Sequence, residues 1–274
     1  MSKPLRQVAV SVVKPRVSER TWAKLREINP QFTKQRGPTE AQRMNTAARK
    51  LGTKQPLAQR ARLRPSLESL GLQYGIDKWV AHQYASHYEC HFKDLRRSRL
   101  TLLAIGIDGD RREGVGGASL QIWKHFFPDA QIVGLDLLDK SSLNDKRIIT
   151  YQGNQTDGDL LRSIVKKHRH LQIVIDDGSH RPEHTRATFA ILFPLLSDGG
   201  FYAIEDTQAS YSPRFGGSLD LKDSATTMGM IKDLLDGLNY EVLGDLKPRC
   251  YADSHVVAVH SYHNLVIIEK GRNV

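Results

Sequence analysis

Apolar and polar positions alternate in blocks from Leu100 to the end of the chain. Short apolar runs predict buried strands over residues 101–107, 132–137, 148–151, 172–175, 200–204, 256–261 and 265–269. Apolar positions at helical spacing predict helices between them, over residues 119–127, 159–168, 183–196 and 223–238. Such alternation is typical of parallel strands buried on both faces. The pattern predicts an α/β, doubly wound, mostly parallel sheet, to which a final hairpin adds an antiparallel edge strand.

The chain divides near Ser66, which is a candidate helix cap before Leu67 and Leu70. Residues 1–65 hold 16 Lys and Arg against 3 acidic residues, whereas residues 66–274 hold 24 against 27. The formal net charge of +10 therefore belongs to the first segment. We expect residues 1–65 to be a basic, partly disordered extension and residues 66–274 to be the folded domain. A polyanion-binding tail and an organelle transit peptide are the alternatives for the extension.

Charge and cysteine content restrict the class of protein. The slightly acidic folded domain argues against a positively charged catalytic groove for nucleic acid. Cys90 and Cys250 have no metal-type spacing and suit a reducing compartment. No apolar stretch reaches the roughly 18 residues of a membrane span, and the first residues lack the apolar core of a secretory signal. We expect a cytoplasmic protein without a membrane span.

Acidic residues follow two of the predicted strands. Asp177 follows one, with His180 three positions later, and Glu205 and Asp206 follow the next. The carboxyl ends of neighbouring parallel strands are where α/β sheets bind ligands. Three carboxylates brought there would repel one another unless a cation lay among them, and oxygen ligands suit Mg²⁺ or Mn²⁺. We predict a metal site at Asp177, Glu205 and Asp206, with His180 as general base; helix capping is the alternative for Asp177.

A Gly-rich turn follows the first predicted strand. Gly106, Asp108 and Gly117 lie between this strand and Ser119, which opens the next helix. Glycines there let the backbone approach a ligand, and the start of the helix offers free N–H groups. Asp136 ends the second strand, where an acid in Rossmann-like folds accepts hydrogen bonds from ribose hydroxyls. We predict that these residues bind a nucleoside cofactor. NAD fits them as well as any other nucleoside cofactor.

Three further segments border the predicted site. The loop over residues 151–155, which contains Gln152 and Gln155, follows the third strand and is placed to flank an adenine. Asp176 is expected to support the cofactor or its own loop. Residues 207–221 contain Ser, Pro and Gly and are expected to form a mobile lid over the metal. Tyr84 and Tyr88 belong either to the core or to the mouth of the substrate site.

Several longer motifs occur in one order along the chain. They are Tyr-Gly-Ile-Asp-Lys-Trp (74–79), Gly-Gly-Ala-Ser-Leu-Gln-Ile-Trp-Lys (116–124), Gly-Leu-Asp-Leu-Leu-Asp-Lys-Ser (134–141), Asp-Asp-Gly-Ser-His (176–180), Ile-Glu-Asp (204–206) and His-Asn-Leu-Val-Ile-Ile-Glu-Lys-Gly-Arg-Asn (263–273). With these motifs, residues from about 66 to 273 resemble the S-adenosylmethionine-dependent macrolide and antibiotic sugar O-methyltransferases, of the mycinamicin type. The resemblance implies a class I methyltransferase, Rossmann-like fold.

The resemblance also implies an activity. We expect a Mg²⁺-dependent O-methyltransferase that moves a methyl group from S-adenosylmethionine to a sugar hydroxyl of a glycosylated natural product or glycolipid, acting as a homo-oligomer. In this family the residues that match Asp177, Glu205 and Asp206 hold Mg²⁺, and the residue that matches His180 is the proposed base.

One departure from the family pattern and several alternatives remain. Members of the family usually carry an acidic residue where this chain has Ala104, and Asp108 is the candidate substitute. A catechol-type small-molecule O-methyltransferase would use the same metal chemistry with a different pocket. A nucleic-acid-associated methyltransferase would be guided by the basic extension. An NAD-dependent reductase would need a Tyr/Lys pair at helical spacing, which the sequence does not show.

Overall fold

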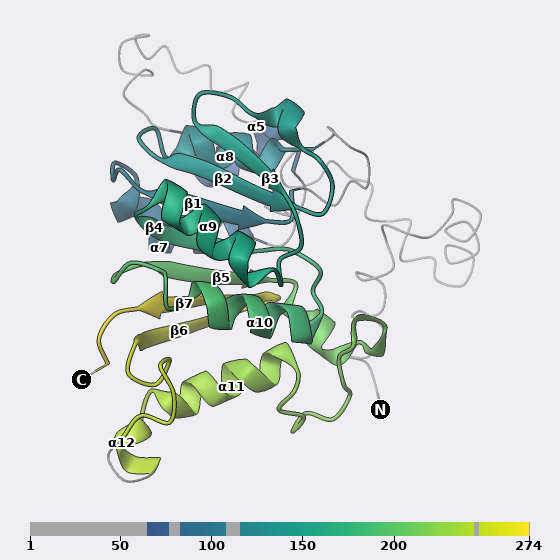
Figure 1. Ribbon diagram of the computed structural model, residues 1–274, viewed down its shortest axis with the longest axis vertical. Helices are drawn as coiled ribbons and strands as arrows, with labels where there is room; N and C mark the ends of the chain where they lie inside the picture. The colour runs from purple at the N-terminus through teal and green to yellow at the C-terminus, as the bar shows by residue number, and fades with distance from the viewer. Residues whose placement is uncertain (1–64, 77–82, 108–115, 244–246, 274) are drawn as a thin grey trace, which may run out of the picture. The chain divides into compact units, whose positions relative to one another are not determined.

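The computed structural model describes residues 65–76, 83–107, 116–243 and 247–273, which form an α/β domain around one sheet (Figure 1). The sheet has seven strands in the order β3-β2-β1-β4-β5-β7-β6. Their bounds are β1 Thr101–Ile105, β2 Gln131–Asp136, β3 Ile148–Gln152, β4 Leu171–Asp176, β5 Phe201–Glu205, β6 Val256–Tyr262 and β7 Leu265–Lys270. Strands β1 to β5 are parallel, and β7 is antiparallel to both β5 and β6. The predicted sheet is confirmed: β7 and β6 form an antiparallel pair at one edge, and β7 is the strand that runs against the others.

Helices cover both faces of this sheet (Figure 1). One face is covered by α5 (Leu67–Tyr74), α7 (Tyr84–Phe92) and α8 (Ala118–Phe126), and the other by α9 (Gly158–His168), α10 (Pro182–Leu192) and α11 (Thr227–Gly237). The short helix α12 (Tyr240–Leu243) follows α11. Among these residues no helix is long and apolar enough to cross a membrane. Residues 1–64 of the predicted extension lie outside the described residues.

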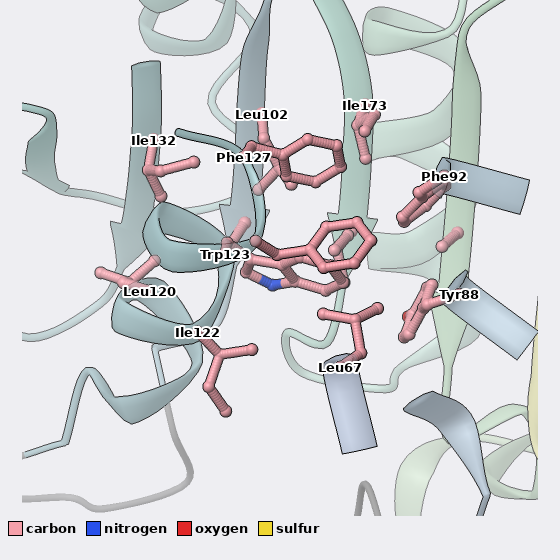
Figure 2. Close-up of a cluster of buried hydrophobic side chains, with 14 of the residues drawn as sticks. Leu67, Tyr88, Phe92, Leu102, Leu120, Ile122, Trp123, Phe127, Ile132 and Ile173 are labelled. Atoms are coloured by element: carbon pink, nitrogen blue, oxygen red, sulfur yellow. The ribbon is translucent and has the colours of Figure 1, made fainter. Parts of the chain in front are cut away.

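Side chains that alternate along each strand divide between two apolar cores. Leu102 and Ala104 of β1 contribute to the core under α5, α7 and α8, whereas Leu103 and Ile105 contribute to the core on the opposite face. This division follows from the two-residue period of a strand. Figure 2 shows the first core, in which the fully buried Trp123 lies among apolar side chains of helices and strands. Because both faces are covered, the sheet edge formed by the strand ends is the place left for chemistry.

The ends of the elements have local causes. Ser66 caps α5 by accepting a hydrogen bond from Ser69 N at 3.1 Å, as predicted. Thr226 caps α11 in the same way, which is why this helix begins later than the sequence pattern suggested. The first predicted strand was two residues too long, because Gly106 leaves the sheet with a φ of +82°.

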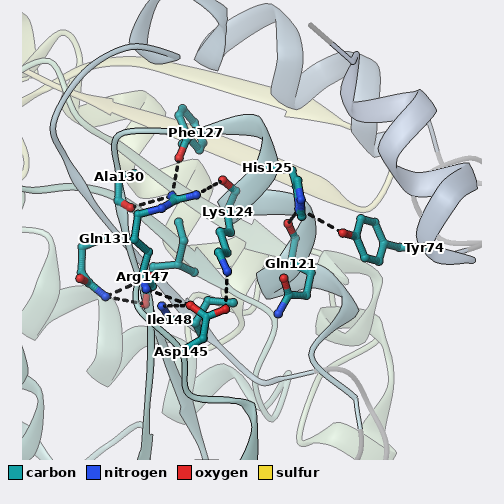
Figure 3. A network of polar contacts seen from close by, with 11 residues as sticks. Tyr74, Gln121, Lys124, His125, Phe127, Ala130, Gln131, Asp145, Arg147 and Ile148 are labelled. Atoms are coloured by element: carbon teal, nitrogen blue, oxygen red, sulfur yellow. Dashed lines mark hydrogen bonds and ion pairs between the residues drawn. The ribbon is translucent and has the colours of Figure 1, made fainter. Parts of the chain in front are cut away.

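The carboxyl end of α8 is fixed to the neighbouring strands by Arg147 (Figure 3). Its guanidinium donates to the carbonyls of Phe127, Ala130 and Lys124 at 2.9 to 3.1 Å. These carbonyls lie at or just after the last turn of α8, where a helix leaves acceptors without intrahelical donors. An ion pair between Lys124 and Asp145 adds a second link to the loop before β3. Helix α8 is thereby held in place behind the Gly-rich turn that precedes it.

Candidate active site

The segments that follow β1, β4 and β5 leave the sheet side by side. In the register of the sheet Ile105 pairs with Asp176, and Asp176 pairs with Ile204. The residues that follow these positions therefore share one edge, the carboxyl edge of the parallel strands. This edge is where open α/β sheets bind ligands. It carries the predicted metal, base and cofactor residues.

A metal-compatible cluster lies at this edge. Asp177, His180 and Asp206 are half-buried, and one potential ligand atom from each lies within 4.8 Å of the others. His180 Nε2 lies 3.5 Å from Asp206 Oδ2. Strand β5 ends at Glu205, and Asp206 adopts a left-handed conformation with a φ of 54°. Because the strand stops there, Asp206 is free of the strand alternation that would send adjacent side chains to opposite faces.

Glu205 is placed differently from the other predicted ligands. It is buried, and its Oε1 accepts a hydrogen bond of 2.8 Å from the hydroxyl of Tyr88. Its carboxylate is not in the group of ligand atoms that lie within 4.8 Å of one another. It nevertheless faces the same region, since the pKa of the Tyr84 hydroxyl is raised first by burial and then by Asp206, Glu205 and Asp177. The three carboxylates therefore act on one buried hydroxyl.

Helix α7 supplies the hydroxyl groups beneath the carboxylates. Tyr84 and Tyr88 are buried in the core, and the Tyr84 hydroxyl donates to the carbonyl of Asn264 at 2.9 Å. Asn264 lies in the turn between β6 and β7, and its carbonyl also accepts from Thr207 N at 3.2 Å. Sequence analysis left the placement of both tyrosines open. They are core residues whose hydroxyl groups reach the polar edge.

The Gly-rich turn packs directly against the segment that carries the predicted metal ligand. A Cβ at Gly106 would lie 2.2 Å from the carbonyl oxygen of Asp177, and Asp177 N donates to Ile105 O at 2.9 Å. Gly106 is thus required for close packing between the loops after β1 and β4. Asp108 lies outside the described residues. Ala104, which replaces the usual acid, is a buried core residue of β1.

Asp136 holds two loops together at the end of β2. Its Oδ2 accepts from Ile107 N and its Oδ1 from Leu138 N, both at 2.9 Å. Each carboxylate oxygen has a further lone pair. Asp136 therefore shapes the turn after β1 and retains the capacity to bind a ribose, the role that the sequence predicted for it.

Three other predicted cofactor residues lie around the same edge. Gly117 has a φ of +86° immediately before α8, and a Cβ there would contact Leu143 at 2.6 Å. Ser119 is buried in the first turn of α8. Gln152, at the end of β3, is exposed, and its Nε2 donates to Leu137 O at 3.3 Å. Gly117 and Ser119 thus lie where the segment after β1 enters α8, and Gln152 is the last residue of β3.

Asp176 is buried and serves its own loop. Its carboxylate accepts from Gln155 Nε2 at 3.2 Å and from the Tyr202 hydroxyl at 3.3 Å. Burial raises the pKa of Asp176 to about 6, against the opposing effect of hydrogen bonds from Gly178, Tyr202 and Gln155. Sequence analysis placed Gln155 only in the loop expected to flank the adenine. Neither charge nor periodicity in the sequence indicates that the Gln155 side chain points inward.

The segment after Asp206 forms two short 3-10 turns, η4 (Thr207–Tyr211) and η5 (Pro213–Phe215). The ring of Phe215 lies edge-on to His180, with ring centroids 6.1 Å apart. Leu219 and Leu221 of the same segment are exposed. The predicted lid therefore lies beside the candidate base and presents apolar side chains to solvent; its mobility stays a prediction.

Known proteins resemble this chain in sequence. It is 41% identical over 226 residues to mycinamicin VI 2''-O-methyltransferase of Micromonospora griseorubida, a match that covers 81% of this chain and 57% of the relative. It is 43% identical over 214 residues to demethylmacrocin O-methyltransferase of Streptomyces fradiae, covering 77% of this chain and 54% of the relative. The chain thus spans little more than half the length of these relatives. No family model matches it.

A solved structure resembles the chain in fold as well. It is the MycE methyltransferase from the mycinamycin biosynthetic pathway, in complex with Mg, SAH and mycinamycin VI. The TM-score is 0.73 at 39% sequence identity, and the match covers 83% of this chain and 61% of that chain. Sequence and fold therefore agree on one relationship: over the matched region, this chain belongs to the family of antibiotic sugar O-methyltransferases.

Proposed function

We propose that this chain is a divalent-cation-dependent O-methyltransferase that moves a methyl group from S-adenosylmethionine to a sugar hydroxyl of a glycosylated natural product. The observation that carries the proposal is the cluster of Asp177, His180 and Asp206 at the carboxyl edge of the sheet. Its relatives are O-methyltransferases of antibiotic pathways, and one was solved with Mg and SAH.

The residues at this edge fit Mg²⁺ or Mn²⁺. Asp177 and Asp206 offer carboxylate oxygens close to each other, and Glu205 adds a third carboxylate on the adjoining residue. Hard divalent cations prefer such oxygen ligands. We propose Asp177, Glu205 and Asp206 as the ligands. A bound cation would stabilise the negative charge that develops on a substrate hydroxyl as its proton leaves.

The chain's own residues provide the proton acceptor and the cofactor surface. His180 would take the proton of the sugar hydroxyl, and the Asp206 carboxylate, 3.5 Å from Nε2, would stabilise the protonated ring. The loops after β1, β2 and β3 would hold S-adenosylmethionine through Gly106, Asp108, Gly117, Ser119, Asp136 and Gln152, with Asp176 supporting them. We further propose that residues 66–274 form the catalytic domain of a cytoplasmic homo-oligomer and that residues 1–65 are an extension.

Two measurements test this function. Calorimetry with S-adenosylhomocysteine and with NAD should give heat for the first alone. Transfer of labelled methyl from S-adenosylmethionine should then be measured with demethylated macrolide glycosides and with a simple catechol as acceptors. Transfer to the glycoside supports the proposal, whereas transfer to the catechol alone would favour a catechol-type enzyme. Tight NAD binding without a response to S-adenosylhomocysteine would refute it.

A further inference from the structure

The buried side chain of Gln155 joins the loop after β3 to the loop after β4. Its Oε1 accepts a hydrogen bond of 2.8 Å from Ser179 N, directly before His180. Its Nε2 lies 3.2 Å from both Asp176 Oδ1 and Thr188 Oγ1. One amide group therefore contacts the end of β4, helix α10 and the segment that carries the proposed base. Buried amides held at both ends have little freedom to move.

The segment from Asp177 to His180 is enclosed on two sides. A Cβ at Gly178 would lie 2.3 Å from Gln155 Oε1, so the backbone there packs against the Gln155 amide. On the other side Gly106 packs against the Asp177 carbonyl. Asp177 is held by β1 through its own N–H, whereas His180 lies three residues further along, beyond the sheet. Contacts of the loop therefore help to set the position of His180, together with Asp206 and Phe215.

His180 has a backbone that needs such contacts. Its φ is 57°, a left-handed conformation that non-glycine residues keep only where the surroundings enforce it. Gln155 fixes the residue before it through Ser179 N. Ser179 Oγ accepts from Arg181 N at 3.3 Å and lies 2.9 Å from His184 Nδ1. These bonds restrain the peptide on both sides of His180.

We propose that Gln155 is a positioning residue, whose amide oxygen, by accepting the Ser179 N–H, holds His180 in its left-handed conformation with the imidazole beside Asp206. The inference rests on the proposed function, in which His180 is the base and the loop of Gln155 borders the cofactor. It gives that loop a second role, because the segment expected to flank the adenine also sets the geometry of proton transfer. Asp177 is held by the sheet, so the metal ligand should depend less on Gln155.

Two variants separate positioning from general stability. Gln155→Met keeps the length of the side chain and removes both the acceptor for Ser179 N and the amide donor to Asp176 and Thr188. Thr188→Val removes another partner of the same amide and leaves the bond to Ser179 in place. Turnover, KM for the methyl donor, the affinity for Mn²⁺ and amide hydrogen exchange over residues 177–184 would be measured for each.

The expected pattern is specific. Gln155→Met should lower kcat by roughly tenfold, the scale of one hydrogen bond, with the KM for the methyl donor and the Mn²⁺ affinity little changed. Thr188→Val should retain kcat. The Ser179 amide should lose exchange protection in Gln155→Met alone.

Each other outcome overturns the proposal. Full kcat in Gln155→Met would show that His180 is held without Gln155. Equal losses of kcat in both variants would reduce Gln155 to a structural role. A wild-type protein without methyl transfer would refute the proposed function, and hydrogen exchange would then decide the inference alone: unchanged protection of Ser179 and His180 in Gln155→Met refutes it.

Discussion

His180 and Asp206 share a left-handed backbone, although neither is glycine, with φ values of 57° and 54°. Asp and His enter this region more readily than branched residues, at a cost of about 1–3 kcal/mol that the surroundings must offset. The two conformations bring His180 Nε2 within 3.5 Å of Asp206 Oδ2. Strained backbone at two residues that meet is a common property of functional sites. It supports their assignment as base and ligand.

Replacing His180 with Ala should lower turnover by roughly 10² to 10⁴, the usual contribution of a general base. Affinity for S-adenosylhomocysteine should stay nearly the same, because the cofactor loops follow β1, β2 and β3. His170→Ala is a matched control, since His170 is exposed and precedes β4 at the opposite edge of the sheet. Steady-state kinetics and calorimetry on both variants would test this. Near-full activity of the His180 variant across pH would mean that the imidazole is structural.

Chelation should abolish activity, and added Mg²⁺ or Mn²⁺ should restore it. Asp177→Ala should lower turnover by at least about 10²-fold, because the charge on the reacting oxygen would lose several kcal/mol of stabilisation. Asp159→Ala is the control, as Asp159 is exposed and paired only at the surface with Arg162. Turnover would be titrated with each cation after treatment with EDTA. Full activity in excess EDTA would exclude the metal mechanism.

At the residue scale the sequence predicted which residues could bind a metal or accept a proton, but it did not predict their hydrogen-bond partners. The acids at the ends of β4 and β5 could be found because carboxylates after apolar runs are visible in a sequence. The hydrogen bond from Tyr88 to Glu205 joins residues 117 positions apart, and no local pattern indicates it. The Gln155 contact is equally hidden, since a polar residue in a loop gives no sign of its direction. Such partners are decided by tertiary packing.

Helix α7 connects the candidate site to the antiparallel edge. Its buried tyrosines reach the carboxylates, while its His87 and His91 face β6, with the ring of His91 4.3 Å from that of His260 and its Nε2 2.8 Å from the Tyr262 hydroxyl. His87 stacks on Tyr262 at 3.8 Å. Protonation of His87 and His91 would therefore loosen the same helix that supports Glu205.

This arrangement predicts an acid-dependent loss of stability. Burial, together with His260 and His87, lowers the pKa of His91 from 6.5 to about 4. The folded protein keeps His91 neutral to about pH 4, whereas the unfolded chain binds a proton near pH 6.5, so acid favours unfolding between these values. Glu269, within 3.8 Å of His260, is the acidic group that faces the cluster.

Thermal unfolding at pH 7.5 and 5 would measure the effect. The wild-type melting temperature should fall over this interval, and His91→Gln should reduce the fall because it removes the titrating group. His170→Gln, at an exposed position, should behave like wild type. An unchanged pH dependence in His91→Gln would place the acid sensitivity elsewhere.

At the scale of elements, the pattern predicted strands and helices well and their ends less well. The interior of each strand is buried, so its residues are apolar and form a run that can be recognised in the sequence. Ends depend on single contacts: Gly106 ends β1 because Asp177 packs against it, and the Thr226 side chain starts α11. The insertion of β7 between β5 and β6 reverses a chain direction at the edge of the sheet. The sequence of the hairpin predicted that β6 pairs with β7, but only the structure shows that β7 lies between β5 and β6.

For the whole molecule, charge and core separate the chain into two parts. The excess of basic residues lies within residues 1–65, whereas in the part of the chain that the structure describes the two apolar cores extend from Leu67 to Ile268. Every residue proposed for the site also lies after Leu100. The basic segment is therefore expected to act outside the chemical step.

Removal of residues 1–60 should leave methyl transfer largely intact. The truncated protein keeps Ser66, which caps α5, and α5 is tied to α7 by the bond from Leu67 N to Glu89 Oε2 at 2.9 Å. The packing beneath Glu205 should therefore survive, and kcat with the glycoside should stay close to the full-length value. The solubility of the protein and its binding to anionic partners should change, because most of the positive charge is lost. Circular dichroism would establish that the variant is folded, and a loss of turnover in a folded variant would show that the basic segment contributes to the active site.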